Sequence, residues 1–216
     1  GAFFGTGSLT GLVFDGESRL LSIGENAFYS SALTSVTVPA GVTTIGGSAF
    51  ERCKDLTQVT VNGTVVGESM FYMSGVETAN LPNVETVGQS AFAGCTALSE
   101  LSMPNVKQIG SSAFQSTKLT EFTLPDTVES TGSSILYGAN ITRLTVSLGT
   151  LLEEGVDPAA FLNAFYNADP YENNTQIILT GVDQDVTLLE NGLKANGREL
   201  QFTTAMYQAF LVTDVQ

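Results

Sequence analysis

Two cysteines are the first side chains of this sequence whose type and spacing could support chemistry. Cys53 and Cys95 each lie three residues after a phenylalanine, in a position that other segments fill with serine or threonine. A reactive thiol needs a nearby cationic group or imidazole, and a metal site needs more than two separated thiols. The chain contains no histidine, so neither a Ser-His-Asp nor a Cys-His arrangement is available. We therefore expect free, buried thiols, and we expect no enzyme activity, cofactor or metal.

Two glutamates form the second candidate. Glu100 and Glu121 stand at equivalent positions, so they should point the same way from adjacent strands, at a spacing compatible with a shared proton. This arrangement is the basis of a remote alternative, a carbohydrate-active acidic patch. Such a site would also need a cleft and sugar-stacking aromatic residues, and neither is evident on that face. The simpler interpretation is a solvated acidic patch, with Arg143 relieving the repulsion.

Two further motifs have local explanations. Asp183-Gln184-Asp185 has the Asp-x-Asp form that opens a calcium loop, but the glycine and closing glutamate of an EF-hand are not at their positions. It is expected to be a turn. The pair Gly46-Gly47 recurs with a repeat and follows no buried strand of a nucleotide-binding fold, so phosphate binding is not expected.

The cysteines, the two glutamates and the Gly46-Gly47 pair all lie in a sequence repeat. The repeat reads apolar-Thr-x-apolar-x-apolar-Pro, followed by x-x-Val-x-x-Ile-Gly-x-x-Ala-Phe. Its opening apolar residue recurs at gaps of 24, 23, 20, 22, 21 and 22 residues, at Leu9, Leu33, Leu56, Val76, Leu98, Leu119 and Ile141. Alternating apolar residues predict a short strand with one buried face, and the proline ends its ladder. The phenylalanine enters the interior, and the fixed glycine fits a corner that needs positive φ or close approach.

This pattern resembles the BspA-like leucine-rich repeats of bacterial cell-surface proteins over about residues 9 to 146. Two stretches depart from it. The segment 55–74 lacks the proline, and the segment from Ser130 to Leu136 loses both Ile-Gly and Ala-Phe, so the solenoid is expected to fray or be capped there. The resemblance implies a leucine-rich-repeat solenoid, a right-handed β/α superhelix that is mostly β with short turns or 3₁₀ segments, in a surface or secreted protein that binds host matrix or bacterial surface proteins.

Composition narrows the possible partners. The chain has 216 residues, 43% of them apolar, with 8 basic and 22 acidic residues and a formal net charge of −14. This charge opposes binding to phosphate backbones and anionic lipid, so nucleic acid is not expected as a partner. No apolar run approaches the ~18 residues needed to cross a bilayer, so membrane insertion is not expected either. The start in the middle of a repeat leads us to expect further sequence upstream, where an export signal or anchor could lie.

Two surfaces are candidates for binding. The residues between the buried positions of each strand should form two outward-facing ladders. One ladder reads Ser35, Gln58, Thr78, Glu100, Glu121, Arg143; the other reads Thr37, Thr60, Asn80, Ser102, Thr123, Thr145. The second candidate is an aromatic rim one residue after the repeat phenylalanine, at Tyr29, Tyr72 and Tyr137. The alternatives are a merely solvated polar sheet and tyrosines packed against the next turn.

The chain is expected to divide into a solenoid of six to seven turns at 1–146 and an acidic segment at 147–216. In this segment Asp157-Pro158 predicts a helix start, residues 176–182 a strand, and Asn196-Gly197 a tight hairpin. The segment should be an α+β cap for the open end of the solenoid or a small α+β module. The leading hypothesis is an extracellular or cell-surface adhesion module that recognises proteins, and the alternative is a structural spacer in a larger surface protein.

Overall fold

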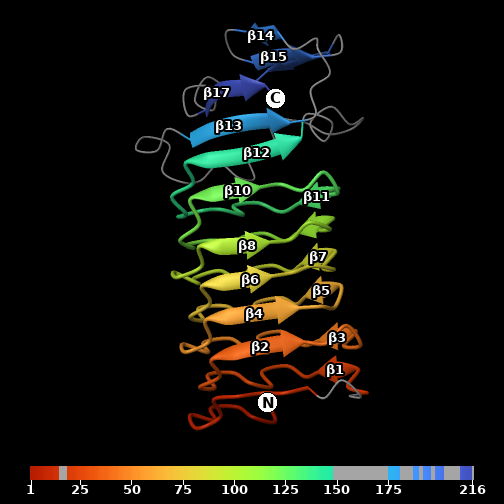
Figure 1. The fold of residues 1–216 in the computed structure, drawn as a ribbon, viewed down its shortest axis with the longest axis vertical. Helices are drawn as coiled ribbons and strands as arrows, with labels where there is room; N and C mark the ends of the chain where they lie inside the picture. The colour runs from red at the N-terminus through yellow and green to blue at the C-terminus, as the bar shows by residue number, and fades with distance from the viewer. Residues whose placement is uncertain are drawn as a thin grey trace.

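The computed structural model describes residues 1–14 and 19–147, together with strands at 175–180, 187–189, 192–195, 198–201 and 210–215. Between residue 1 and residue 147 the chain forms a leucine-rich-repeat β-solenoid, with one strand of every regular turn stacked beside the next (Figure 1). No described residue belongs to a helix, so none forms a helix long and apolar enough to cross a bilayer.

One face of the solenoid is built from parallel strands, and those from β2 to β12 begin two residues after the opening apolar residue of the repeat. They form two separate sheets, with the strand orders β2-β4-β6-β8 and β10-β12-β13-β17. The bounds are β2 Ser35–Val38, β4 Gln58–Val61, β6 Thr78–Asn80, β8 Glu100–Ser102, β10 Glu121–Thr123, β12 Arg143–Ser147, β13 Thr175–Thr180 and β17 Phe210–Val215. In β2 the burial alternates, with Val36 and Val38 inside and Ser35 and Thr37 outside, which confirms the predicted strand pattern.

A second face carries short strands at the Ile-Gly positions. These strands also pair in parallel, β1 with β3, and β5, β7, β9 and β11 in order. Their bounds are β1 Ser22–Ile23, β3 Thr44–Ile45, β5 Val65–Val66, β7 Thr86–Val87, β9 Gln108–Ile109 and β11 Ser130–Thr131. The pairing of β9 with β11, and a bond from the Phe114 N–H to the Ile135 carbonyl at 3.0 Å, show that stacking continues through the divergent 130–136 segment. The expectation that the solenoid frays there is wrong, because Leu136 fills the phenylalanine slot and is buried.

The third segment of each turn, around Ala-Phe, is a short turn, one of the two expected forms, and not a 3₁₀ or helical segment. In Ser48-Ala49-Phe50-Glu51-Arg52 the first and last residues have φ values of 57° and 58°, and left-handed residues at both ends prevent a helix. Alternate amides instead donate to the next turn, such as the Phe50 N–H to the Met70 carbonyl at 2.9 Å. The β/α description is therefore corrected to an all-β solenoid for the part of the chain that the structure describes.

From Gly46 onward the fixed glycine serves close approach to the preceding turn, and the alternative of a positive φ at that position is wrong. A Cβ on Gly88 would lie 2.7 Å from the Glu68 nitrogen of the preceding turn. The left-handed residue lies two positions later, at Ser90 with φ 54°. The glycine therefore sets the spacing between turns, while a serine makes the bend.

The core contains a column of phenylalanine rings that runs through the stack beside buried aliphatic side chains. Phe3, Phe28, Phe50, Phe71, Phe92 and Phe114 stack in succession with centroid separations of 5.1 to 5.6 Å. The last four rings, from Phe50 to Phe114, are fully buried, and no single turn could bury them alone.

Beyond residue 147 the described strands partly match the expected cap. β13 lies where a strand was predicted and pairs in parallel with β12, so it continues the solenoid sheet. The strands β14 (Thr187–Leu189), β15 (Gly192–Ala195) and β16 (Arg198–Gln201) form an antiparallel sheet, with β15 and β16 on either side of the predicted Asn-Gly turn. The helix predicted at Asp157-Pro158 and the turn at 183–185 lie outside the described residues. The α+β cap is thus not supported, and the boundary at 146 stays a prediction.

Candidate binding surface

The two predicted ladders lie in register on the strand face. Direct Cα pairing links Ser35 to Gln58, Gln58 to Thr78, and Thr78 to Glu100. The second ladder pairs Thr37, Thr60, Asn80 and Ser102 in the same way, and Thr123 pairs with Thr145. Every one of these side chains is exposed or half-buried, so the face presents polar groups at a spacing of about 4.8 Å within each of its two sheets.

Glu100 and Glu121 do not lie on paired strands, which corrects the expectation drawn from their equivalent positions. β8 and β10 belong to different sheets, and a cavity of about 500 Å³ lies between them. The Arg143 guanidinium lies 3.9 Å from the Glu121 carboxylate, as expected, whereas Glu100 accepts a 3.5 Å hydrogen bond from the Thr78 hydroxyl. Each carboxylate thus has its own neighbour, and shared protonation has no structural basis.

The predicted aromatic rim is not continuous. Tyr29 stacks on Phe4 with ring centroids 4.8 Å apart and planes 1° from parallel, but neither Tyr72 nor Tyr137 makes such a ring contact among the described residues. Tyr29 and Tyr72 are half-buried, and Tyr137 is exposed. The structure therefore places the three tyrosines on one edge without bringing them together.

The two cysteines are free and buried, as the sequence predicted. Each thiol donates to a phenylalanine carbonyl of the preceding turn, Cys53 to Phe28 at 3.1 Å and Cys95 to Phe71 at 3.0 Å. Each also lies against a serine hydroxyl, Ser31 at 3.2 Å for Cys53. Burial raises the pKa of the Cys53 thiol and raises that of Cys95 to about 11, so both stay protonated at neutral pH and are poor nucleophiles.

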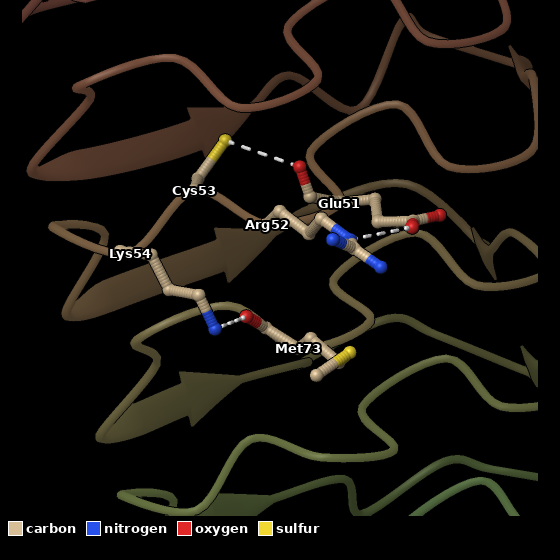
Figure 2. A network of polar contacts seen from close by, with 5 residues as sticks. All are labelled: Glu51, Arg52, Cys53, Lys54 and Met73. Carbon is tan, nitrogen blue, oxygen red and sulfur yellow. Dashed lines mark hydrogen bonds and ion pairs between the residues drawn. The ribbon is translucent and has the colours of Figure 1, made fainter.

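The charged side chains beside Cys53 are occupied by local contacts (Figure 2). The Arg52 Nε lies 3.5 Å from the Glu51 carboxylate, and the Lys54 ammonium donates to the Met73 carbonyl of the next turn at 2.6 Å. The Cys53 sulfur lies 4.0 Å from the Glu51 carbonyl oxygen. Lys54 thus links two turns, Arg52 pairs within its own turn, and neither contacts the thiol. The described residues contain no group of three or more metal-ligating side chains.

A row of asparagines at the corner after the strand was missed by sequence reasoning. The Asn83 amide donates to the Asn62 carbonyl at 3.2 Å, and the Asn105 amide donates to the Pro82 carbonyl at 2.7 Å. The recurrence of asparagine at these points was a signal that could have revealed the row. The cavity between β8 and β10 was also missed, and a Phe122 in a column of aliphatic residues was its available signal.

Comparisons with known proteins agree with this architecture. The family model for the BspA type leucine rich repeat region matches in six copies, over residues 1–99 and 21–143. A search of curated proteins found no match.

Several solved bacterial structures are similar. A leucine-rich repeat protein from Bacteroides ovatus shares 22% identity at a TM-score of 0.57, covering 73% of this chain and 40% of its own. One from Eubacterium ventriosum shares 22% identity at a TM-score of 0.44, covering 76% of this chain and 36% of its own. A leucine rich cell surface protein from Faecalibacterium prausnitzii shares 19% identity at a TM-score of 0.39, covering 83% of this chain and 69% of its own. The chain thus covers less than half of the length of the Bacteroides ovatus and Eubacterium ventriosum proteins. The likeness to the Bacteroides ovatus protein supports the fold alone.

Proposed function

Because the chain belongs to the BspA-type leucine-rich repeat family of bacterial surface proteins, we propose that it is a non-enzymatic module that recognises other proteins through its strand face. The observation that supports this most directly is the register of the two ladders, which runs from β2 to β8 without a break. A rigid, regularly spaced polar face is the kind of extended surface that repeat proteins present to partners.

The chemistry of this face fits a polar partner of modest affinity. Its ladders carry hydroxyl and amide groups, two glutamates and one arginine, and no aromatic side chain. Tight interfaces usually depend on buried Trp, Tyr and Arg anchors. We therefore propose contact over many weak positions, with host matrix or bacterial surface proteins as the partner class.

The test is a binding assay on immobilised host matrix proteins and bacterial surface proteins, with two double variants of the full chain. Thr37→Arg with Asn80→Arg places two bulky cations on the strand face, where both native side chains are exposed. Thr44→Arg with Gln108→Arg makes the same substitutions of charge and size on exposed residues of the second face. We expect binding to fall at least tenfold in the first variant and to change less than twofold in the second. Equal losses in both would contradict recognition by the strand face.

A structural spacer is the second candidate, favoured by the absence of aromatic anchors from both ladders. It predicts no binding above background in the same assay from a fully folded chain. The spacer and the recognition module share a proposed location, the outside of a bacterial cell. Accessibility of the chain to antibody on intact cells of the source bacterium would test that location, and labelling only after lysis would contradict it.

A further inference from the structure

The parallel sheet on the strand face is interrupted between β8 and β10. At two other rungs the residue after the strand donates to the next turn, the Leu81 N–H to the Ser102 carbonyl at 2.8 Å and the Leu124 N–H to the Thr145 carbonyl at 2.9 Å. The equivalent pair, Met103 N–H and the Thr123 carbonyl, is not hydrogen-bonded. The sheet orders likewise separate β8 from β10.

The bond at the beginning of the strand is missing in the same way. The Glu77 carbonyl accepts from the Glu100 N–H at 3.2 Å, but the Ser99 carbonyl and the Glu121 N–H, at the corresponding positions, are not joined. The amides of Met103 and Glu121 and the carbonyls of Ser99 and Thr123 therefore face an opening in the sheet. They form two strand edges of complementary pattern.

The opening is wider than the gap between directly paired strands. Cα atoms of β8 and β10 lie mostly more than 8 Å apart, whereas directly paired parallel strands lie about 4.8 Å apart and a strand inserted between two others needs roughly twice that. Figure 1 shows the arrows of β8 and β10 further apart than those of β6 and β8. The sheet on the second face also breaks, between β3 and β5, but there the Cα atoms stay mostly within 8 Å. Only the strand face opens.

The other two segments of these turns remain closed, so the opening is a local feature of one face. The Phe114 N–H still donates to the Ile135 carbonyl at 3.0 Å, and β9 still pairs with β11. Phe122 explains the difference, since the same inward position holds Ala79 and Leu101 in the preceding strands. Its ring lies 5.6 Å from that of Phe114 and is tilted by 58°, out of the parallel stack. A ring in an aliphatic column pushes β10 away from β8.

The lining of the opening specifies what would fit. Its cavity of about 500 Å³ lies within the size range of ligand pockets. Exposed Glu100 and Glu121 lie on either side of the opening at the start of β8 and β10. Ser102 and Thr123 lie on either side of it two residues further along the strands, and also face outward. Leu101, between these two positions, faces inward. It is only half-buried, whereas Val36, Val59 and Ala79 at the equivalent positions of the earlier strands are buried.

We propose that this opening takes one extended segment of a partner protein, inserted as a strand between β8 and β10. The segment carries Lys or Arg level with the two glutamates, a small apolar residue facing Leu101 and Phe122, and Ser or Thr level with Ser102 and Thr123. Main-chain hydrogen bonds to both edges hold the segment, and the alternating side chains select it. This inference rests on the proposed recognition function and names the partner segment for it.

The test uses the full chain and the capped peptide acetyl-Ser-Lys-Val-Thr-Leu-Gly-amide, with amide hydrogen exchange followed by NMR. We expect saturable binding and at least tenfold slower exchange of the Met103 and Glu121 amides. The Leu81 and Leu124 amides, already bonded to the next strand, should change less than twofold. A peptide with proline in place of valine lacks a backbone N–H and should bind at least tenfold more weakly.

A matched pair of double variants tests the charge. Glu100→Gln with Glu121→Gln should weaken binding three- to tenfold, whereas Glu25→Gln with Glu129→Gln, which removes the same charge from exposed acids outside the opening, should change it less than twofold. Equal effects would overturn the assignment of a basic residue. Binding without protection of Met103 and Glu121, or no binding, would overturn insertion. The assay on immobilised proteins judges the recognition function separately, so either result leaves that function standing.

Discussion

At the scale of single residues, the small polar column shows how the solenoid tolerates hydrogen-bonding groups in its core. Ser31, Cys53, Ser74 and Cys95 occupy one slot in successive turns, and a hydroxyl or thiol there finds a partner in the neighbouring turn. No buried side-chain nitrogen or oxygen among the described residues lacks a hydrogen bond. Serine and cysteine are interchangeable in this slot because both are small donors, so the cysteines carry structure and not reactivity.

Because the pKa of Cys95 is raised, the protein should become less stable as the pH rises into the alkaline range. Its thiol ionises near pH 9 in the unfolded chain and at about 11 in the folded one, so its contribution is fully present below pH 9 and is lost as pH rises toward 11. The loss should total ~3 kcal/mol. Cys95→Ser keeps the hydrogen-bonding slot, as Ser74 does, and removes the titration. Urea denaturation at pH 8 and pH 10.5 should therefore show a smaller loss in the variant, and equal losses would contradict the shift.

The fixed glycine gives a second expectation at this scale. Gly88→Ala would put a Cβ 2.7 Å from the Glu68 backbone nitrogen, which can move only if two turns separate. We expect a loss of roughly 1–3 kcal/mol in the free energy of unfolding, typical of overpacking. Gly24→Ala is the matched control, because its Cβ would meet nothing within 4 Å, and it should be neutral or slightly stabilising. Urea denaturation of both variants distinguishes close approach from a general intolerance of side chains at this corner.

At the scale of elements, the strands were predictable and the connections between them were not. Alternation in Ser35-Val36-Thr37-Val38 defines both the strand and its buried face, and the equal distance of Ser35 and Gln58 from the repeat leucine places them opposite each other. The Ala-Phe segment carried no comparable signal, because serine at positive φ is uncommon outside repeats that enforce it. For the candidate site, the ladders followed from the same alternation. The opening did not, because it depends on how far one ring, Phe122, displaces a neighbouring strand.

The ring column should dominate the stability of each turn. Phe71 is fully buried between Phe50 and Phe92, so Phe71→Ala leaves a cavity that two neighbouring turns cannot close. We expect a loss of about 3–5 kcal/mol. Phe3→Ala removes a ring that is 46% exposed and stacks on one neighbour, so it should cost roughly 1 kcal/mol or less. Calorimetric or urea denaturation of both variants is the measurement, and similar losses would contradict a column that is supported from both sides.

At the scale of the whole molecule, the solenoid is a one-dimensional stack in which each turn contacts only its neighbours. Its stability is then approximately the sum of the turns and of the interfaces between them. Most of these interfaces combine hydrogen bonds on the strand face, the second face and the Ala-Phe segment. The interface between the turns of β8 and β10 lacks the first set, although the other two persist. The net charge of −14 adds a repulsion that favours separating the stack at its weakest interface.

The stack should therefore open first between β8 and β10. Under increasing urea below the global transition, we expect the amides of Phe114 and Gly132, which bond across the interface between the turns of β8 and β10, to lose exchange protection before those of Leu81 and Phe71, which bond across earlier interfaces. The physical reason is that separation at this interface breaks fewer hydrogen bonds than separation at the others, and sub-global opening follows the lowest local free energy. Hydrogen exchange by NMR at stepped urea concentrations is the measurement. If all four amides lost protection at the same urea concentration, the interface between the turns of β8 and β10 would be as stable as the other interfaces, which would contradict the prediction.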